Sequence, residues 1–218
     1  SGWVALLDVL PRNYAVVLAR GLLARRALGL AIDDETLADL LERSRALLRS
    51  EVAGWIDDSH GGEGRFDIYS ADVHLFAEPL AAELAPDWAT GMAATLDHAA
   101  GLGARNGATH VWGRSTGVLS VCLTIELAAH AVRHQSGAHR SMWLARLDRS
   151  ERCLDGWFAD GLITAHVGRS PYAYRGPARR LQLTFDVLGK LAVAALDLRA
   201  AAGEVGVPVE AYPPVDRL

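Results

Sequence analysis

Residues 54–76, GWIDDSHGGEGRFDIYSADVHLF, concentrate side chains that can do acid–base chemistry. Hydrolysis of a glycosidic bond uses two carboxyl groups, one as proton donor and the other as base or nucleophile. Asp57, Asp58 and Glu63 are candidates for one of them. Asp57 and Asp58 are neighbours in the chain, so we do not expect them to form the pair with each other. Asp160 is the distant candidate for the second carboxyl group.

The same stretch contains other groups that could transfer protons. If the residues after the loop form a helix, Asp67, His74 and Glu78 share one face, and Tyr69 lies on another. His74 could act as an acid or base oriented by Glu78 one turn later, or the two could be a structural pair in the core. His60 is a further acid or base candidate, or else an exposed loop residue.

Two later loops carry side chains suited to holding a sugar. Arg114 and Ser115 precede an apolar helix, whose first N–H groups and dipole favour an anion, or Ser115 simply caps that helix beside a solvated Arg114. Residues 166–180 interleave arginines with tyrosines; a charged run is usually a solvated face, but the tyrosines make a sugar- or anion-binding wall more plausible than usual. The candidate binding residues are Trp55, Arg65, Trp112, Arg114, Ser115, His166, Arg169, Tyr172, Tyr174 and Arg175.

The composition excludes several classes of protein. With 218 residues, 50% hydrophobic and 22% charged, the chain should fold around a real core. A net charge of −4 and the lack of a long apolar run argue against nucleic-acid and membrane partners, and the first residues do not resemble a secretion signal. We expect Cys122 and Cys153 to be buried free thiols in a cytoplasmic protein.

Motifs for cofactor chemistry are missing from the sequence. There is no HExxH motif, the histidines show no recognised metal-ligand spacing, and neither GxSxG nor a glycine-rich nucleotide loop is present. We therefore expect no metal and no other cofactor.

Hydrophobic periodicity predicts an all-α fold without strands. The expected helices cover residues 3–29 (one helix, or a pair broken around Pro11), 35–49, 69–84, 86–101, 115–134, 139–158 and 180–202. Helices 115–134 and 180–202 are apolar almost all the way round and should be surrounded by protein, whereas 35–49 and 139–158 are polar on one side. Asp186 and Lys190, four residues apart, should form a buried ion pair.

The alternation of apolar and amphipathic helices predicts concentric inner and outer helices. Polar loops at 54–68, 103–114 and 161–179 each precede an inner helix, so in an α/α toroid they would line a funnel at one end. An ordinary helical bundle or solenoid with variable surface loops is the alternative.

Three stretches together resemble a known family. DDSHGGEGRFDIYSADVHLFAEPLA, VWGRSTGVLS and YAYRGPARRLQLTFDVLGKLA, in this order and spacing, resemble an uncharacterised bacterial family of the six-hairpin glycosidase superfamily. The resemblance implies an α/α toroid that acts on carbohydrate. With three to four hairpins, residues 1–207 would form an incomplete ring and 208–218 a linker or tail, so we expect a piece of a longer protein. The rest of the ring, or self-association, would cover the exposed inner helices.

Three functional hypotheses follow. A glycoside hydrolase acting on an oligo- or polysaccharide, with a uronate substrate suggested by the arginines, is favoured by the acidic loop and the resemblance. A polysaccharide lyase would instead use His74 or His60 with Tyr69 or Tyr174, and Arg114 would neutralise the sugar carboxylate. The third is a non-catalytic sugar-binding or assembly module.

Overall fold

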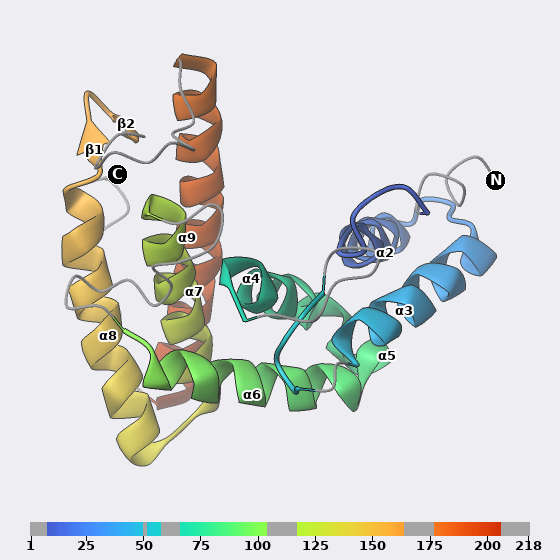
Figure 1. The fold of residues 1–218 in the computed structure, drawn as a ribbon, viewed down its shortest axis with the longest axis horizontal. Helices are drawn as coiled ribbons and strands as arrows, with labels where there is room; N and C mark the ends of the chain where they lie inside the picture. Colours follow the sequence, from blue (N-terminus) through green and yellow to red (C-terminus); the bar gives the residue numbers. More distant parts are fainter. Residues whose placement is uncertain (1–7, 50–51, 58–65, 104–116, 164–176, 206–218) are drawn as a thin grey trace. The chain divides into compact units, whose positions relative to one another are not determined.

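A computed structural model describes residues 8–49, 52–57, 66–103, 117–163 and 177–205 of the chain. In these residues the fold is all-α, as the sequence predicts, apart from one short β-hairpin (Figure 1). The chain divides into two compact units, Ser1–Gly101 and Leu102–Leu218. None of the helices in the described part of the chain combines the length and the apolar character that a bilayer span requires.

The N-terminal unit consists of short helices packed around one apolar core. Its elements are α2 (Tyr14–Ala27), α3 (Asp34–Leu48), α4 (Ile68–Phe76), the 3-10 helix η1 (Glu78–Leu80), α5 (Ala81–Leu84) and α6 (Asp87–Gly101). Helix α3 begins where the Asp33 side chain accepts a hydrogen bond from the Glu35 amide, and its leucines at one face are buried, as the amphipathic pattern predicts. The core combines Val16 and Ala19 of α2 with Leu37, Leu40, Leu80 and Leu84.

The helix predicted over 69–84 is interrupted in the structure. Helix α4 ends at Phe76, and η1 and α5 follow it. Pro79 lies in the first turn of η1, where its missing N–H is tolerated. A proline there cannot donate to a carbonyl of the preceding turn, so the α-helical hydrogen-bond ladder is not continued from α4.

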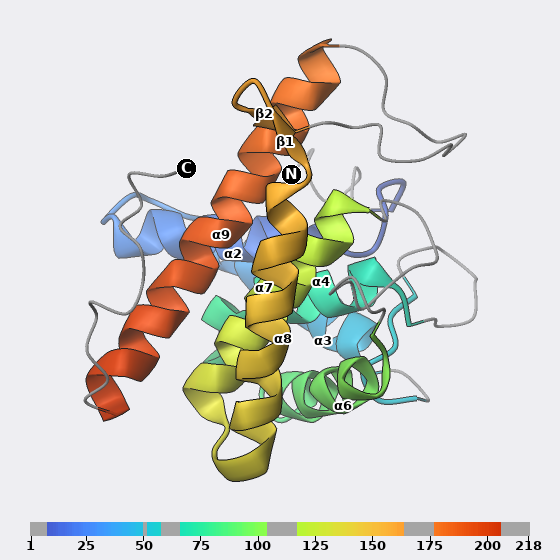
Figure 2. The same ribbon diagram turned by 90° about the vertical axis from the view of Figure 1, so that its left-hand side faces the viewer.

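In the C-terminal unit one buried helix lies between two others. Its elements are α7 (Val118–His134), α8 (Gly137–Asp155), the strands β1 (Phe158–Ala159) and β2 (Leu162–Ile163), and α9 (Pro177–Val205). Helix α7 packs against both α8 and α9 (Figures 1 and 2). Of its 17 residues 14 are buried, so the prediction that an all-round apolar segment is surrounded by protein is correct for α7.

The β-hairpin was not predicted from the sequence. Phe158 pairs with Ile163 and Ala159 with Leu162 in antiparallel register. The two loop residues, Asp160 and Gly161, both have positive φ, 53° and 72°, which is the backbone that an Asp-Gly hairpin turn requires. Strands of two residues are too short to produce a recognisable alternation of polar and apolar side chains.

Helix α9 is less buried than predicted. The structure packs it against α7 and β2, and it leaves four large apolar side chains exposed, Leu181, Phe185, Val193 and Leu196, with exposed fractions between 38% and 65%. The prediction that residues 180–202 are surrounded by protein is therefore wrong for this side of the helix in the described structure. The apolar sequence alone does not say how many neighbours a helix has.

The predicted Asp186–Lys190 ion pair is also wrong. Lys190 Nζ lies 3.0 Å from a carboxylate oxygen of Glu126 on α7, and Asp186 is exposed. Arg133 and Asp197 form a second link between α7 and α9, with 2.7 Å between Nη1 and Oδ1. Both links join residues 64 apart in the sequence, a pairing that helical spacing cannot reveal.

Candidate functional site

In the N-terminal unit, the described residues on both sides of segment 58–65 lie against α6. Gly54 has φ +82°, and a Cβ added there would lie 3.0 Å from a backbone nitrogen of α6, so the turn approaches the helix as closely as glycine allows. His98 donates from Nε2 to the Ala53 carbonyl at 3.0 Å, and the Phe66 ring meets the same imidazole edge-on at 5.1 Å. The two flanks of the acidic loop are therefore fixed on one helix.

Asp57 is the member of the acidic cluster that the structure describes. Its side chain is 15% exposed, and one carboxylate oxygen lies 3.9 Å from Nη1 of Arg12. The same guanidinium donates to the Asp57 backbone carbonyl at 3.3 Å. Trp55, two residues earlier, is half-buried. Arg12, two residues before α2, thus holds Asp57 in place, and the Asp57 side chain keeps some access to solvent.

Asp67 has a structural role at the start of α4. Its Oδ1 accepts hydrogen bonds from the amides of Tyr69 at 3.0 Å and Ser70 at 3.3 Å, and the Ser70 hydroxyl accepts from the Asp67 amide in return. This reciprocal arrangement is a capping box, which satisfies amides that the first helical turn leaves open. Asp67 is 4% exposed, and the Tyr69 side chain is half-buried.

His74 is a core residue. Its ring has no exposed surface, and Nδ1 lies 2.7 Å from the Ser70 carbonyl and 3.3 Å from the Thr95 hydroxyl. On the other side, a Cβ added at Gly91 of α6 would lie 2.3 Å from Nε2. Burial lowers the pKa of His74 to about 4, although its hydrogen bond to Ser70 acts in the opposite direction. The imidazole is therefore neutral at neutral pH and fills the space between α4 and α6.

The predicted His74–Glu78 pair does not form. Helix α4 ends at Phe76, so Glu78, the first residue of η1, no longer follows the helical spacing that would put it one turn above His74. The ring instead makes its hydrogen bonds within α4 and to α6. Both roles left open by the sequence paired His74 with Glu78, and neither is observed, because His74 packs in the core with Ser70 and Thr95 as its partners.

In the C-terminal unit, the start of α7, the end of α8 and the β-hairpin lie at the same end. Gly117, which precedes α7, has φ +86°, and a Cβ there would lie 3.1 Å from the indole of Trp157. Trp157 follows α8 and leads directly into β1. Glycine at this position therefore allows the entry to α7 to pack against the residue that joins α8 to the hairpin.

The first turns of α9 are fastened to the same hairpin. Arg180 donates from Nε to the Ile163 carbonyl at 3.0 Å and from Nη2 to the Ala159 carbonyl at 3.4 Å. The Thr184 hydroxyl accepts from the Ile163 amide at 3.0 Å and donates to the Arg180 carbonyl at 2.8 Å. The hairpin is thus held by hydrogen bonds along both strands, and Asp160 is exposed at its tip.

Two of the predicted binding segments adjoin this end of the C-terminal unit. Segment 104–116 leads into Gly117, and segment 164–176 joins Ile163 to Pro177. The binding candidates that they carry lie outside the described residues, namely Trp112, Arg114, Ser115, His166, Arg169, Tyr172, Tyr174 and Arg175. The same is true of Asp58, His60, Glu63 and Arg65 in the N-terminal unit, and of the tail expected over 208–218.

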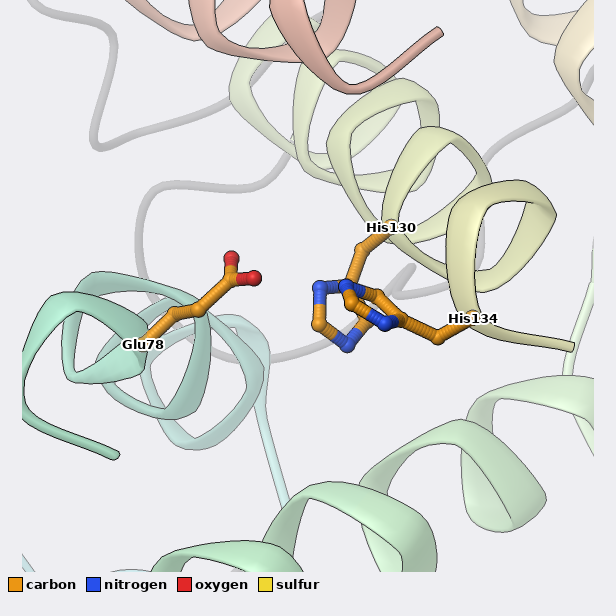
Figure 3. A group of neighbouring side chains, drawn as sticks. All are labelled: Glu78, His130 and His134. Atoms are coloured by element: carbon orange, nitrogen blue, oxygen red, sulfur yellow. The ribbon is translucent and has the colours of Figure 1, made fainter. Parts of the chain in front are cut away.

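The structure also brings together a pair of residues that the sequence analysis did not select. His130 and His134 lie one turn apart on α7, with 4.5 Å between ring centroids and 41° between ring planes (Figure 3). Glu78, which the same view labels, belongs to the N-terminal unit. Two histidines at i and i+4 of a predicted helix are a signal that could have found this pair.

The cysteines are free, as predicted. Cys122 is fully buried in α7, and burial raises the pKa of its thiol to about 12, which makes it unreactive at neutral pH. Cys153 on α8 is only partly buried.

Comparisons of the chain with protein-family models, with curated proteins and with solved structures found no match.

Proposed function

We propose that the chain is a carbohydrate-active enzyme, a glycoside hydrolase that cleaves an oligo- or polysaccharide with paired carboxyl groups. The observation that carries the proposal is the meeting of three segments at one end of the C-terminal unit. There the entry to α7, the Asp160 hairpin and the start of α9 are held together by the Gly117–Trp157 contact and the Arg180 hydrogen bonds. We propose an α/α toroid as the architecture, because its helical hairpins bring their loops together at one end as these segments do.

Asp160 is the candidate for one of the two carboxyl groups. It is exposed, and it sits on a turn whose backbone is constrained by two strands and by the α9 hydrogen bonds. A catalytic carboxyl group needs both properties, since it must reach the substrate and must be held in a productive geometry. Asp57, with its partial exposure and its Arg12 partner, is the described candidate for the other group, together with Asp58 and Glu63.

The substrate class follows from the residues of the adjoining segments. Arginines interleaved with tyrosines can hold a sugar carboxylate through paired donors and stack against sugar rings. The positive end of the α7 dipole also favours an anion at this end of the unit. These features support a uronate-containing substrate.

The experiment is an activity screen of the purified chain on acidic and neutral oligosaccharides, with reducing ends and ultraviolet absorbance recorded together. We expect reducing ends without new absorbance. In Asp160→Asn the rate should fall by roughly 100-fold or more, because acid–base catalysis contributes about that much. Asp186→Asn, an exposed aspartate on α9, is the matched control and should keep the wild-type rate.

The results can contradict the proposal in two ways. Full turnover in Asp57→Asn, Asp58→Asn, Glu63→Gln and Asp160→Asn would show that these carboxyl groups are not catalytic. Absorbance of an unsaturated uronate would mean elimination, which is lyase chemistry. His74 would be a poor base for that reaction because its ring has no exposed surface.

A second candidate, an assembly module, is favoured by the apolar face of α9. Phe185 and Leu196 are 64% and 65% exposed, which is unusual for two large apolar side chains on one helix. If a second copy of the chain covers this face, sedimentation will show a dimer that Phe185→Asp dissociates and Asp186→Asn does not. A wild-type chain that sediments as a monomer at all concentrations would exclude self-association.

A cytoplasmic location accords with the two free thiols.

A further inference from the structure

The C-terminal end of α7 presents two imidazole rings side by side. His130 and His134 are separated by one helical turn, and their candidate ligand atoms lie within 4.8 Å of each other. His130 is 3% exposed and His134 is exposed, so the pair runs from the protein interior to the surface. An ion from solvent can therefore reach the pair past His134.

The chemistry of the pair selects a class of ion. Imidazole nitrogens are good ligands for Zn²⁺, Cu²⁺ and Ni²⁺, whereas Mg²⁺ and Ca²⁺ prefer oxygen. Histidines at i and i+4 of a helix share one face, and this spacing supplies two zinc ligands in known helical sites. Because α7 is a 17-residue helix with most of its residues buried, its backbone already holds the two rings on one side before an ion arrives.

The surrounding charges suit a cation. The pair lies at the C-terminal end of α7, with His134 in the last turn, where the carbonyl groups of the helix carry partial negative charge. The nearest cationic side chain in that turn, Arg133, is engaged with Asp197 on α9 at 2.7 Å, which offsets its charge. Helix geometry and local electrostatics thus point in the same direction.

We propose that His130 and His134 form a binding site for a divalent transition-metal ion, with Zn²⁺ as the expected ion. Two histidines leave coordination positions that water can occupy, so the site is open to a further ligand. The site is independent of the proposed hydrolase chemistry, which uses carboxyl groups and no metal.

The test measures Zn²⁺ binding to the whole chain after treatment with a chelator and dialysis. Titration calorimetry should show one ion bound by the wild type. Because even the outer partners of metal ligands are worth about 10- to 100-fold in affinity, loss of either ligand should weaken binding by at least about tenfold. His130→Gln and His134→Gln are the test variants, and His139→Gln, an exposed histidine on α8, is the matched control.

A spectroscopic readout separates ligation from an effect on folding. His134 is exposed, so His134→Gln should fold normally, which circular dichroism will verify. With Cu²⁺ as the probe, electron paramagnetic resonance should show coupling to two imidazole nitrogens in the wild type and to one in His134→Gln. Equal Zn²⁺ affinity in His134→Gln and His139→Gln, or a Cu²⁺ spectrum unchanged by His134→Gln, would overturn the proposal.

Discussion

Acid should destabilise the N-terminal unit through one buried histidine. Burial lowers the pKa of His74 from 6.5 to about 4. The Ser70 carbonyl can only accept, so Nδ1 carries the proton of the neutral ring and Nε2 faces Gly91. Protonation would place a new charge and a new N–H at that packed contact. The folded chain therefore binds fewer protons than the unfolded chain as the pH falls below 6.5.

The size and the direction of the effect follow from these two pKa values. The His74 contribution to stability is fully present above pH 6.5, falls as the pH drops toward 4, and stays constant below that value. The loss is about 2 kcal/mol between pH 7 and pH 5, and about 3 kcal/mol in total.

The assay is urea denaturation of the wild type and of His74→Asn between pH 8 and pH 4. The asparagine amide can replace Nδ1 as a donor to the Ser70 carbonyl, but it does not titrate. Other titrating groups contribute equally to both proteins, so the difference between the two pH profiles isolates His74. Proton NMR of the imidazole C2–H resonance measures its pKa directly.

Two results would refute this reasoning. If the NMR resonance of His74 titrates near pH 6.5, the ring is solvated or paired in solution and is not packed between Ser70 and Gly91. If the NMR value is near 4 but the two proteins lose stability in parallel, the energy of protonation is not linked to unfolding.

Two further predictions concern packing and a buried ion pair. Gly91→Ala should destabilise the chain by about 1 to 2 kcal/mol, because overpacking against His74 outweighs the better helix propensity of alanine. Gly21→Ala should instead stabilise the chain by about 0.5 to 1 kcal/mol, because nothing lies within 4 Å of the new methyl group. Thermal denaturation compares them, and equal shifts would contradict the contact. Lys190→Met should lower the free energy of unfolding, measured by urea denaturation, by about 3 kcal/mol, because the mostly buried Glu126 carboxylate loses its ion pair with Lys190. The double variant with Glu126→Gln should recover most of this loss. A Lys190→Met variant as stable as the wild type would show that the pair is not formed in solution.

The sequence predicted the type and the place of most helices well, because local signals control both. The sequence by itself shows the apolar stripe and the Asp33 cap of α3. It also shows the continuous apolar run of α7. The break after Phe76 was missed although Pro79 signals it, because the apolar periodicity on both sides continues in phase. The β-hairpin was missed because an Asp-Gly turn between two-residue strands carries little pattern.

The candidate site was predictable in the types of its residues but not in their environment. Asp67 and His74 have the side chains that catalysis uses, yet one caps a helix and the other fills the space beside Gly91. Sequence spacing cannot distinguish these roles, since burial depends on which helix packs against which. The His130–His134 contact, by contrast, is local to one helix and could have been recognised from its spacing.

Local periodicity and composition by themselves determined that this chain is all-α and that α7 is a central helix. They also determined that the two cysteines of the chain, Cys122 and Cys153, are free thiols. Only the tertiary structure decided that Lys190 pairs with Glu126, that α9 keeps an apolar face exposed and that Arg180 holds the Asp160 hairpin. The physical reason is range. Helix formation and capping depend on residues a few positions apart, whereas burial and ion pairing depend on contacts between segments that are distant in the sequence.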